Sequence, residues 1–216
     1  MNKKIVNQKD TADELWQNFK NAFSLSQDQL DKFKKYYKLL VQNNELFNIT
    51  TITELDPTIK YHFSDSLIIS QFLDFTKINS IADVGTGGGF PGIPLKIMFP
   101  HLKVTLIEVI GKKISFLKEV IEELNLKDIE VNDLDWRTFL RKADFKIDLF
   151  CARASLQPEE LLRIFKPSSI NQDCLLVYWA SKEYVIGAKE KEFFFKEETY
   201  TIGNKNRRLI FFRKAR

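Results

Sequence analysis

The feature that most constrains this chain is a glycine-rich stretch between an apolar run and an apolar helix-like segment. Five of the eight glycines fall within residues 85–92, after the run 80–84 and before the segment 93–99. A short apolar run bounded by turn residues is typical of a buried strand. Glycine allows positive φ and close backbone approach, and a helix start offers unpaired N–H groups. The stretch predicts a strand, turn and helix that can bind a small polar ligand.

This turn fits two classes of ligand. A third alternative is that it binds no ligand and only packs the helix on the strand. The spacing Gly87-x-Gly89-x-x-Gly92, with Glu108 following, satisfies the dinucleotide fingerprint. Asp83 at the end of the strand would instead repel a pyrophosphate, whereas it suits the cationic amine of S-adenosylmethionine. The arrangement of Asp83, the glycines and Glu108 resembles the first two motifs of class I methyltransferases. Each acid has an alternative role in capping the turn.

The rest of the chain predicts an α/β fold with a mostly parallel, doubly wound sheet. Apolar strand-like runs at 104–108, 129–131, 147–151 and 174–179 alternate with helix-like segments at 112–124, 136–141 and 158–165. Two further strands, 192–200 and 207–213, form a hairpin that turns at Gly203 and Asn204. A terminal hairpin is characteristic of the seven-stranded class I S-adenosylmethionine-dependent methyltransferase fold.

The N-terminal part is predicted to be a helical extension packed on this domain. Helices are expected at 11–23 and at 27–43, where Ser26 is the N-cap. A turn-rich connection at 48–57 and an apolar helix at 67–75 follow. We therefore expect a helical extension at 1–76 and a cofactor-binding methyltransferase domain at 77–216.

Composition excludes several classes of protein. The 216 residues are 44% hydrophobic and 29% charged, which is ordinary for a globular domain. Residues 1–10 lack an apolar signal region and no apolar run reaches membrane-spanning length, so we expect a cytoplasmic protein with no membrane contact. Cys151 and Cys174 lie in apolar runs and are expected to be buried free thiols. His62 and His101 add no ligand spacing, and we predict no metal.

The net charge of +4 is concentrated near the C-terminus. Residues 202–216 contain six basic side chains and no acid: Lys205, Arg207, Arg208, Arg213, Lys214 and Arg216. A basic segment suits a polyanion such as RNA. A solvated strand with a basic end explains the pattern equally well.

Several segments together resemble one family. They are Asn48-Ile-Thr50, His62-x-x-Asp65-Ser66, the glycine segment 83–95 with its Phe-Pro-Gly-Ile-Pro, Leu106-Ile-Glu108 with Lys112-Lys113 and Phe116-Leu117, and Arg153-Ala154. Over about residues 39–212 the chain resembles the bacterial small-subunit rRNA guanine-N7 methyltransferases, the RsmG or GidB family. The resemblance implies that S-adenosylmethionine is the cofactor. It also implies that 16S rRNA in the small ribosomal subunit is the partner, methylated at N7 of guanosine 527 in the 530 loop.

The resemblance also implies roles for individual residues. It places the glycine loop and Arg153 at the cofactor, Glu108 at its ribose, and Trp136 and Arg137 beside its adenine. In that loop the predicted contacts are Asp83, Gly85, Gly87 and Phe90. The chain departs from the family at Asp135-Trp136-Arg137, where members commonly carry Arg-x-Glu. It departs again at Glu183, which replaces the glycine after Lys182.

The chemistry of guanine N7 predicts how few catalytic groups are required. N7 has a lone pair and no proton, so its methylation needs no general base, and catalysis is mainly positioning. The catalytic residue stays open, with Arg153, Lys182 and His62 as candidates, and a monomer is expected. Two alternatives remain: an NAD-dependent oxidoreductase that uses the dinucleotide fingerprint, and a catalytically inactive RNA- or ribosome-binding protein on the same fold.

Overall fold

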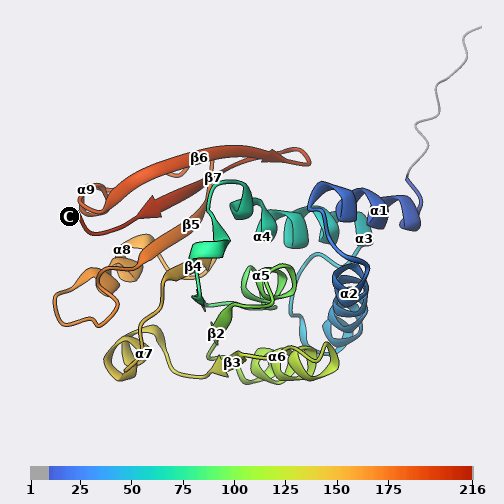
Figure 1. Cartoon of the computed structure of the whole chain (residues 1–216), viewed down its shortest axis with the longest axis horizontal. Helices are drawn as coiled ribbons and strands as arrows, with labels where there is room; N and C mark the ends of the chain where they lie inside the picture. The colour runs from blue at the N-terminus through green and yellow to red at the C-terminus, as the bar shows by residue number, and fades with distance from the viewer. Residues whose placement is uncertain (1–9, 216) are drawn as a thin grey trace, which may run out of the picture.

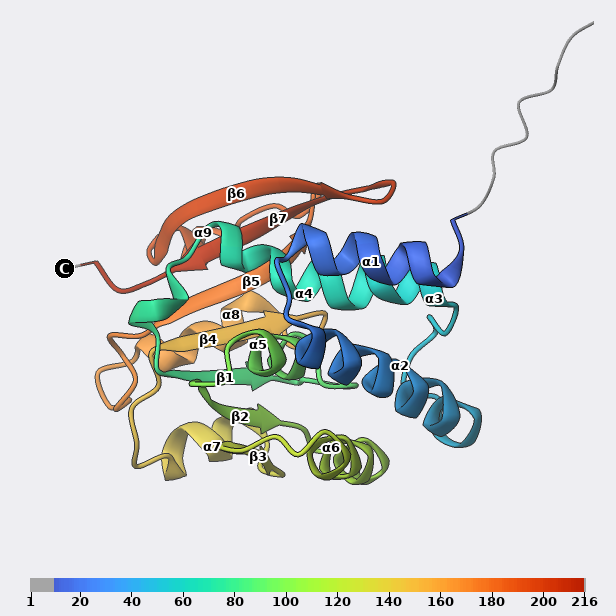
Figure 2. The same cartoon turned by 45° about the vertical axis from the view of Figure 1, so that its right-hand side comes forward.

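The computed structural model describes residues 10–215 and contains one seven-stranded sheet (Figures 1 and 2). The strand order is β3-β2-β1-β4-β5-β7-β6. Only the pairs β5–β7 and β6–β7 are antiparallel. The predicted parallel sheet with a terminal hairpin is therefore confirmed. The expectation for the N-terminus concerns residues 1–9, which lie outside the described residues, as does Arg216 of the basic segment.

The strands match the predicted runs closely. They are β1 (Ser80–Val84), β2 (Lys103–Ile107), β3 (Ile129–Asn132), β4 (Leu149–Arg153), β5 (Leu175–Ser181), β6 (Phe194–Ile202) and β7 (Lys205–Phe212). The main shift is at β4, predicted to begin at Ile147. The Ile147 N–H donates to the Asn171 side chain at 2.7 Å, so sheet pairing begins two residues later.

The helices between the strands are also those expected. They are α5 (Gly92–Met98), α6 (Gly111–Glu123), α7 (Trp136–Lys142) and α8 (Pro158–Leu161), which continues as a 3₁₀ turn (Leu162–Phe165). Pro158 occupies the first turn of α8, where its missing N–H leaves no bond unmade. A short helix, α9 (Ala188–Lys191), was not predicted.

The first two helices begin where their capping residues indicate. Thr11 and Ser26 form capping boxes at the starts of α1 (Ala12–Ala22) and α2 (Gln27–Phe47). The second helix runs four residues past its predicted end and stops at Asn48, whose left-handed backbone caps it.

The segment after α2 departs from the prediction. The helical region begins at α3 (Leu55–Thr58), within the expected turn, and continues through a π-helical turn (Ile59–Ser64) and α4 (Asp65–Leu67). It ends in a 3₁₀ turn (Ile68–Gln71), before the predicted end at Phe75. The turn signal of Pro57 was misleading because a proline in the first helical turn loses no intrahelical bond.

Helices cover both faces of the sheet and form two cores. The larger core joins residues of α1, α2, α5 and α6 to one sheet face, and the smaller core joins α7 and α8 to the other. The N-terminal helices thus share the larger core with the sheet (Figure 2). Cys151 and Cys174 are buried and free, as predicted. None of the helices described in residues 10–215 is both long and apolar enough to cross a membrane.

Candidate functional site

The glycine loop lies between β1 and α5 and is held from below by Asp83. This carboxylate is fully buried, and its Oδ2 accepts hydrogen bonds from Thr86 Oγ1 at 2.6 Å and from the Gly92 N–H at 2.7 Å. Its Oδ1 is buried without a hydrogen-bond partner in the described structure. Burial raises the pKa of Asp83 to about 6. Asp83 therefore caps the turn with one oxygen, while its other oxygen lies unpaired beneath the loop and the residue does not itself line the crevice described below.

Glu108 fixes the upper part of the loop from the end of β2. Its Oε2 accepts from the Gly87 N–H at 3.0 Å, and its Oε1 accepts from the N–H groups of Val109 and Ile110 at 2.9 Å each. Gly87 has φ +61°, a conformation that side chains rarely adopt. The carboxylate keeps unused lone pairs, so it can still accept from a ligand hydroxyl.

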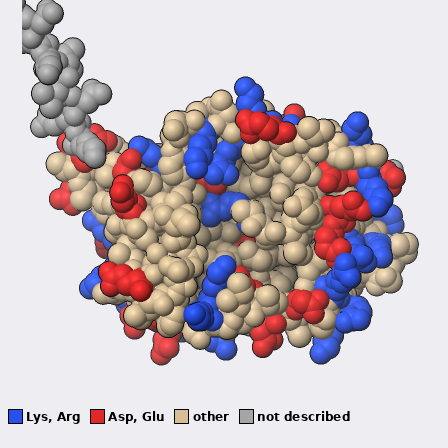
Figure 3. All heavy atoms as spheres, turned by 180° about the vertical axis from the view of Figure 1, so that it is seen from behind, with Lys and Arg blue, Asp and Glu red and all other residues tan. Residues whose placement is uncertain are grey.

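A crevice of about 260 Å³ opens beside this loop at the carboxyl ends of the strands. One wall is the loop itself, from Gly85 to Gly88, with Phe90. The opposite wall comes from the N-terminal extension, and β4 and β7 contribute Arg153 and Arg207. In open α/β sheets ligands bind at this edge. Seen from behind, the molecule is hollowed near its middle, with Lys and Arg side chains close by (Figure 3).

Arg153 and Asp65 form a buried ion pair at the base of the crevice. Arg153 Nη1 donates to Asp65 Oδ2 at 2.9 Å, and the Asp65 side chain is fully buried. Its Oδ1 accepts from Tyr200 Oη at 2.7 Å and lies 3.5 Å from Arg207 Nε. Asp65 thus neutralises the charge of Arg153 at the end of β4.

His62 lies between Arg153 and the N-terminal wall. Its ring stacks on Phe90 with centroids 4.4 Å apart, and the Arg153 guanidinium lies 5.3 Å from the centre of the same Phe90 ring. Burial, and then the charge of Arg153, lower the pKa of His62 to about 3. The imidazole is therefore neutral at physiological pH, and it brings no positive charge into the crevice.

Phe90 has both of the roles left open by the sequence. It lines the crevice, yet it is 5% exposed and packs against Tyr36 with ring centroids 5.4 Å apart. Tyr36, from α2, also donates a hydrogen bond to the carbonyl of Gly88. Tyr36 was missed by sequence reasoning, because nothing in the local pattern of that helix distinguishes it from the neighbouring Tyr37.

Trp136 and Arg137 are placed elsewhere. The Trp136 ring is buried in the smaller core and donates to the Glu160 carbonyl at 2.9 Å. The Arg137 side chain pairs with the Glu160 carboxylate at 2.7 and 3.0 Å, and Asp135 caps α7. Neither side chain lines the crevice, so any contact with an adenine falls to the backbone of this turn. That contact stays a prediction.

The remaining basic residues divide between several surfaces. Lys113 lines the crevice, whereas Lys182 is exposed just beyond the end of β5. Alternation along β7 turns Arg207 toward Asp65 and Arg208 toward Glu197, 3.0 Å away, on the opposite face. Arg213 lies over the ring of Phe195. Among the described residues, the basic segment is therefore no continuous patch.

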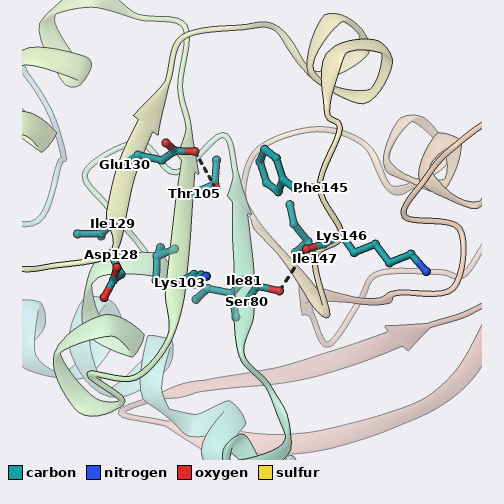
Figure 4. Close-up of a pocket in the computed structure, with 11 residues that line it drawn as sticks. Ser80, Ile81, Lys103, Thr105, Asp128, Ile129, Glu130, Phe145, Lys146 and Ile147 are labelled. Atoms are coloured by element: carbon teal, nitrogen blue, oxygen red, sulfur yellow. Dashed lines mark hydrogen bonds between the residues drawn. The ribbon is translucent and has the colours of Figure 1, made fainter.

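A larger hollow, of about 610 Å³, lies at the opposite, amino-terminal edge of the sheet (Figure 4). It is bordered by the starts of β1, β2 and β3 and by the loop before β4. Its charged side chains are Lys103, Asp128, Glu130 and Lys146. Two long hydrogen bonds join lining residues: Thr105 Oγ1 donates to Glu130 at 3.4 Å, and Ser80 Oγ donates to the Lys146 carbonyl at 3.5 Å (Figure 4). Across residues 10–215, no three His, Cys, Asp or Glu side chains gather to hold a metal ion.

Comparison with known proteins identifies the family. The model of the family described as rRNA small subunit methyltransferase G matches residues 29–210. The chain belongs to this family. Curated relatives named ribosomal RNA small subunit methyltransferase G include one from Halalkalibacterium halodurans, 45% identical over 135 residues, or 62% of this chain and 57% of that protein. One from Bacillus licheniformis is 39% identical over 73% of this chain and 66% of its own length. The chain thus spans little more than half of the first of these relatives.

Solved structures confirm the fold. MtNAS, in a complex with MTA and tNA, has a TM-score of 0.59 at 14% identity and covers 93% of this chain and 82% of its own. A ribosomal protein L11 methylase from Lactobacillus delbrueckii subsp. bulgaricus has a TM-score of 0.51 at 21% identity, over 70% and 77% of the two chains. The chain has the Rossmann-like fold of the class I methyltransferases, as expected.

Proposed function

We propose that this protein transfers a methyl group from S-adenosylmethionine to N7 of a guanosine in the 530 loop of 16S rRNA. The observation that carries the proposal is the crevice at the carboxyl edge of the sheet, lined by the glycine loop and by Arg153. It lies in a chain that has the class I methyltransferase fold and belongs to the rRNA small subunit methyltransferase G family. A bacterial rRNA substrate also agrees with a cytoplasmic enzyme.

The residues on the loop side fit the cofactor. Asp83 Oδ1 is a buried oxygen without a partner, suited to an ammonium group, and it lies under the loop that approaches the ligand. Glu108 is placed to accept from ribose hydroxyls. Gly85 has φ +66°, and a Cβ there would come within 2.5 Å of Ser155 Cβ. The glycine loop and the turn that follows β4 can therefore approach each other only because residue 85 has no side chain.

The mechanism proposed for these residues is one of positioning. S-adenosylmethionine, when bound, supplies a methyl group activated by its sulfonium. Guanine N7 attacks with its own lone pair, so the chain has to orient the base and exclude water, and need not remove a proton. His62 and the paired Arg153 suit this task, because a pKa of about 3 makes the His62 imidazole a very weak base and a guanidinium cannot accept a proton. Methylation makes the base positive, and the neutral His62 adds no repulsion.

The oxidoreductase alternative is not favoured by the loop. In a dinucleotide site the N–H groups at the start of the helix face the pyrophosphate. The Gly92 N–H, at the start of α5, is instead donated to Asp83. The buried carboxylate beneath the loop also opposes an anionic ligand.

The test is transfer of labelled methyl from S-adenosylmethionine to 30S subunits from cells that lack the enzyme, with the modified base mapped by cleavage at N7-methylguanosine. Subunits from cells that contain the enzyme are the matched control, since their site is already methylated. We expect label at a 530-loop guanosine in the first subunits only. Cofactor binding without RNA labelling overturns the substrate, and absence of cofactor binding supports the inactive binding protein.

A further inference from the structure

Thr50 lines the crevice from the connection between α2 and α3. Its hydroxyl oxygen is 2.8 Å from His62 Nε2 and accepts from the Ile52 N–H at 3.1 Å. The other ring nitrogen of His62, Nδ1, lies 3.5 Å from Arg153 Nη2. Three side chains of the crevice thus form a hydrogen-bonded chain that starts at a buried cation.

The donor-to-acceptor direction of these hydrogen bonds follows from Arg153, where the series begins. A guanidinium has only donors, whereas the Tyr61 carbonyl near the same ring accepts, so these two neighbours favour opposite tautomers. The hydrogen bond that the structure gives His62 Nδ1 is the one with Arg153 Nη2, which requires a lone pair on Nδ1. In a neutral imidazole the hydrogen is then on Nε2, which donates to Thr50 Oγ1. A hydroxyl oxygen has two lone pairs and one hydrogen. Both lone pairs of Thr50 are occupied, by His62 and Ile52, and its hydrogen is left to donate.

No protein acceptor for that hydrogen is found within residues 10–215, and Thr50 borders the crevice. A ligand acceptor is therefore expected there. Building on the function proposed above, we infer that Thr50 donates a hydrogen bond to the carbonyl O6 of the target guanine. Thr50 is then a residue that selects guanine.

The chemistry of guanine supports this acceptor. N7 and O6 are the two acceptors on one edge of the base. N7 must stay free to attack, whereas O6 loses water in the crevice and needs a donor. A neutral hydroxyl satisfies O6 without placing a full charge beside the base, which becomes positive on methylation. The cofactor is the less suitable acceptor, since the two carboxylates that fit it, Asp83 and Glu108, are hydrogen-bonded to the glycine loop and not to Thr50 or His62.

The kinetic test compares Thr50→Val, Thr50→Ser and Thr51→Val by methyl transfer to 30S subunits, with cofactor affinity measured by calorimetry. Thr51 is the neighbouring exposed threonine and serves as the matched control. A buried acceptor left without its donor costs roughly 10- to 100-fold in transfer rate, which we expect for Thr50→Val. Thr50→Ser retains the hydroxyl and restores most of the rate, and cofactor affinity is unchanged throughout. A fully active Thr50→Val overturns the inference, as does an equal loss in cofactor affinity.

The second measurement needs no RNA. In the full chain with ¹⁵N-labelled histidine, His101→Gln leaves only the His62 signals, which report the tautomer directly. We expect hydrogen on Nε2 and none on Nδ1 at pH 7. The opposite tautomer means that Thr50 donates to His62, and overturns the inference whatever the enzyme methylates. A wild-type protein that methylates no rRNA overturns the proposed function and O6 as acceptor, while the tautomer still decides whether Thr50 has a free hydrogen.

Discussion

The two edges of the sheet carry hollows of different size, and the smaller hollow is the one lined by buried charged groups. The amino-edge hollow is about 610 Å³ and the carboxyl-edge crevice about 260 Å³. Around the smaller one, a fully buried carboxylate, a buried arginine and a neutral histidine converge. Around the larger one the charged side chains are exposed, and Glu130 accepts only a 3.4 Å hydrogen bond from Thr105. Buried charge that other residues must compensate, and not volume, distinguishes a functional edge.

The largest effect should come from removing the carboxylate at the base of the crevice. Asp65→Ala leaves Arg153 buried without its partner, which typically costs about 3–5 kcal/mol in the free energy of unfolding. Urea denaturation followed by circular dichroism measures the loss. Glu159→Ala, which breaks the exposed pair with Lys189, is the control and should cost no more than about 1 kcal/mol. Equal losses in the two variants would remove the contrast between buried and exposed charge.

The glycine loop should be the next most sensitive. Gly85→Ala puts a side chain at φ +66° against Ser155, and we expect a loss of about 1–3 kcal/mol together with weaker cofactor binding. Calorimetry and thermal unfolding measure the two effects. Gly111→Ala is matched to it, because nothing lies within 4 Å of the added methyl, and it should be neutral or slightly stabilising. An unaffected Gly85→Ala would show that loop and β4 turn separate easily.

The neutral His62 predicts a pH dependence of stability. Its pKa falls from 6.5 to about 3 on folding, so between these values the unfolded chain binds more protons, and stability is lost as pH falls below 6.5. Relative to His62→Gln, the wild type should lose about 2 kcal/mol between pH 7.5 and pH 5. The raised pKa of Asp83 acts in the opposite direction, but it is present in both proteins and cancels. Parallel stability curves would mean that His62 titrates normally.

The smallest effect is expected at the amino edge. Glu130→Gln removes a charge from the larger hollow and should change the free energy of unfolding by less than about 0.5 kcal/mol, with methyl transfer unaltered. The same denaturation and transfer assays measure both quantities. A marked loss of transfer would give this hollow a function and break the comparison between the two edges.

The sequence predicted what depends on local pattern. The strands, the two N-terminal helices and the loop follow from apolar runs, from Ser26 as N-cap of α2 and from five glycines, whereas the capping role of Thr11 was not predicted. It also pointed to Arg153 and His62. It could not pair Asp65 with Tyr200, since 135 residues separate them and no local signal links them. It also could not separate Arg207 from the rest of the basic segment, which requires knowing which face of β7 each residue occupies.

The contact between the hairpin and Asp65 sets an order of events during synthesis. Asp65 and Arg153 are made well before Tyr200 and Arg207, which complete the surroundings of the carboxylate. At roughly 5–20 residues per second, translation from Arg153 to Arg207 takes several seconds. Through that interval β5 has no antiparallel partner. The Asp65–Arg153 ion pair also lacks the contacts of Asp65 with Tyr200 and Arg207. The crevice is thus one of the last parts of the molecule to be finished, because Arg207, which lines it, is added only when β7 is made.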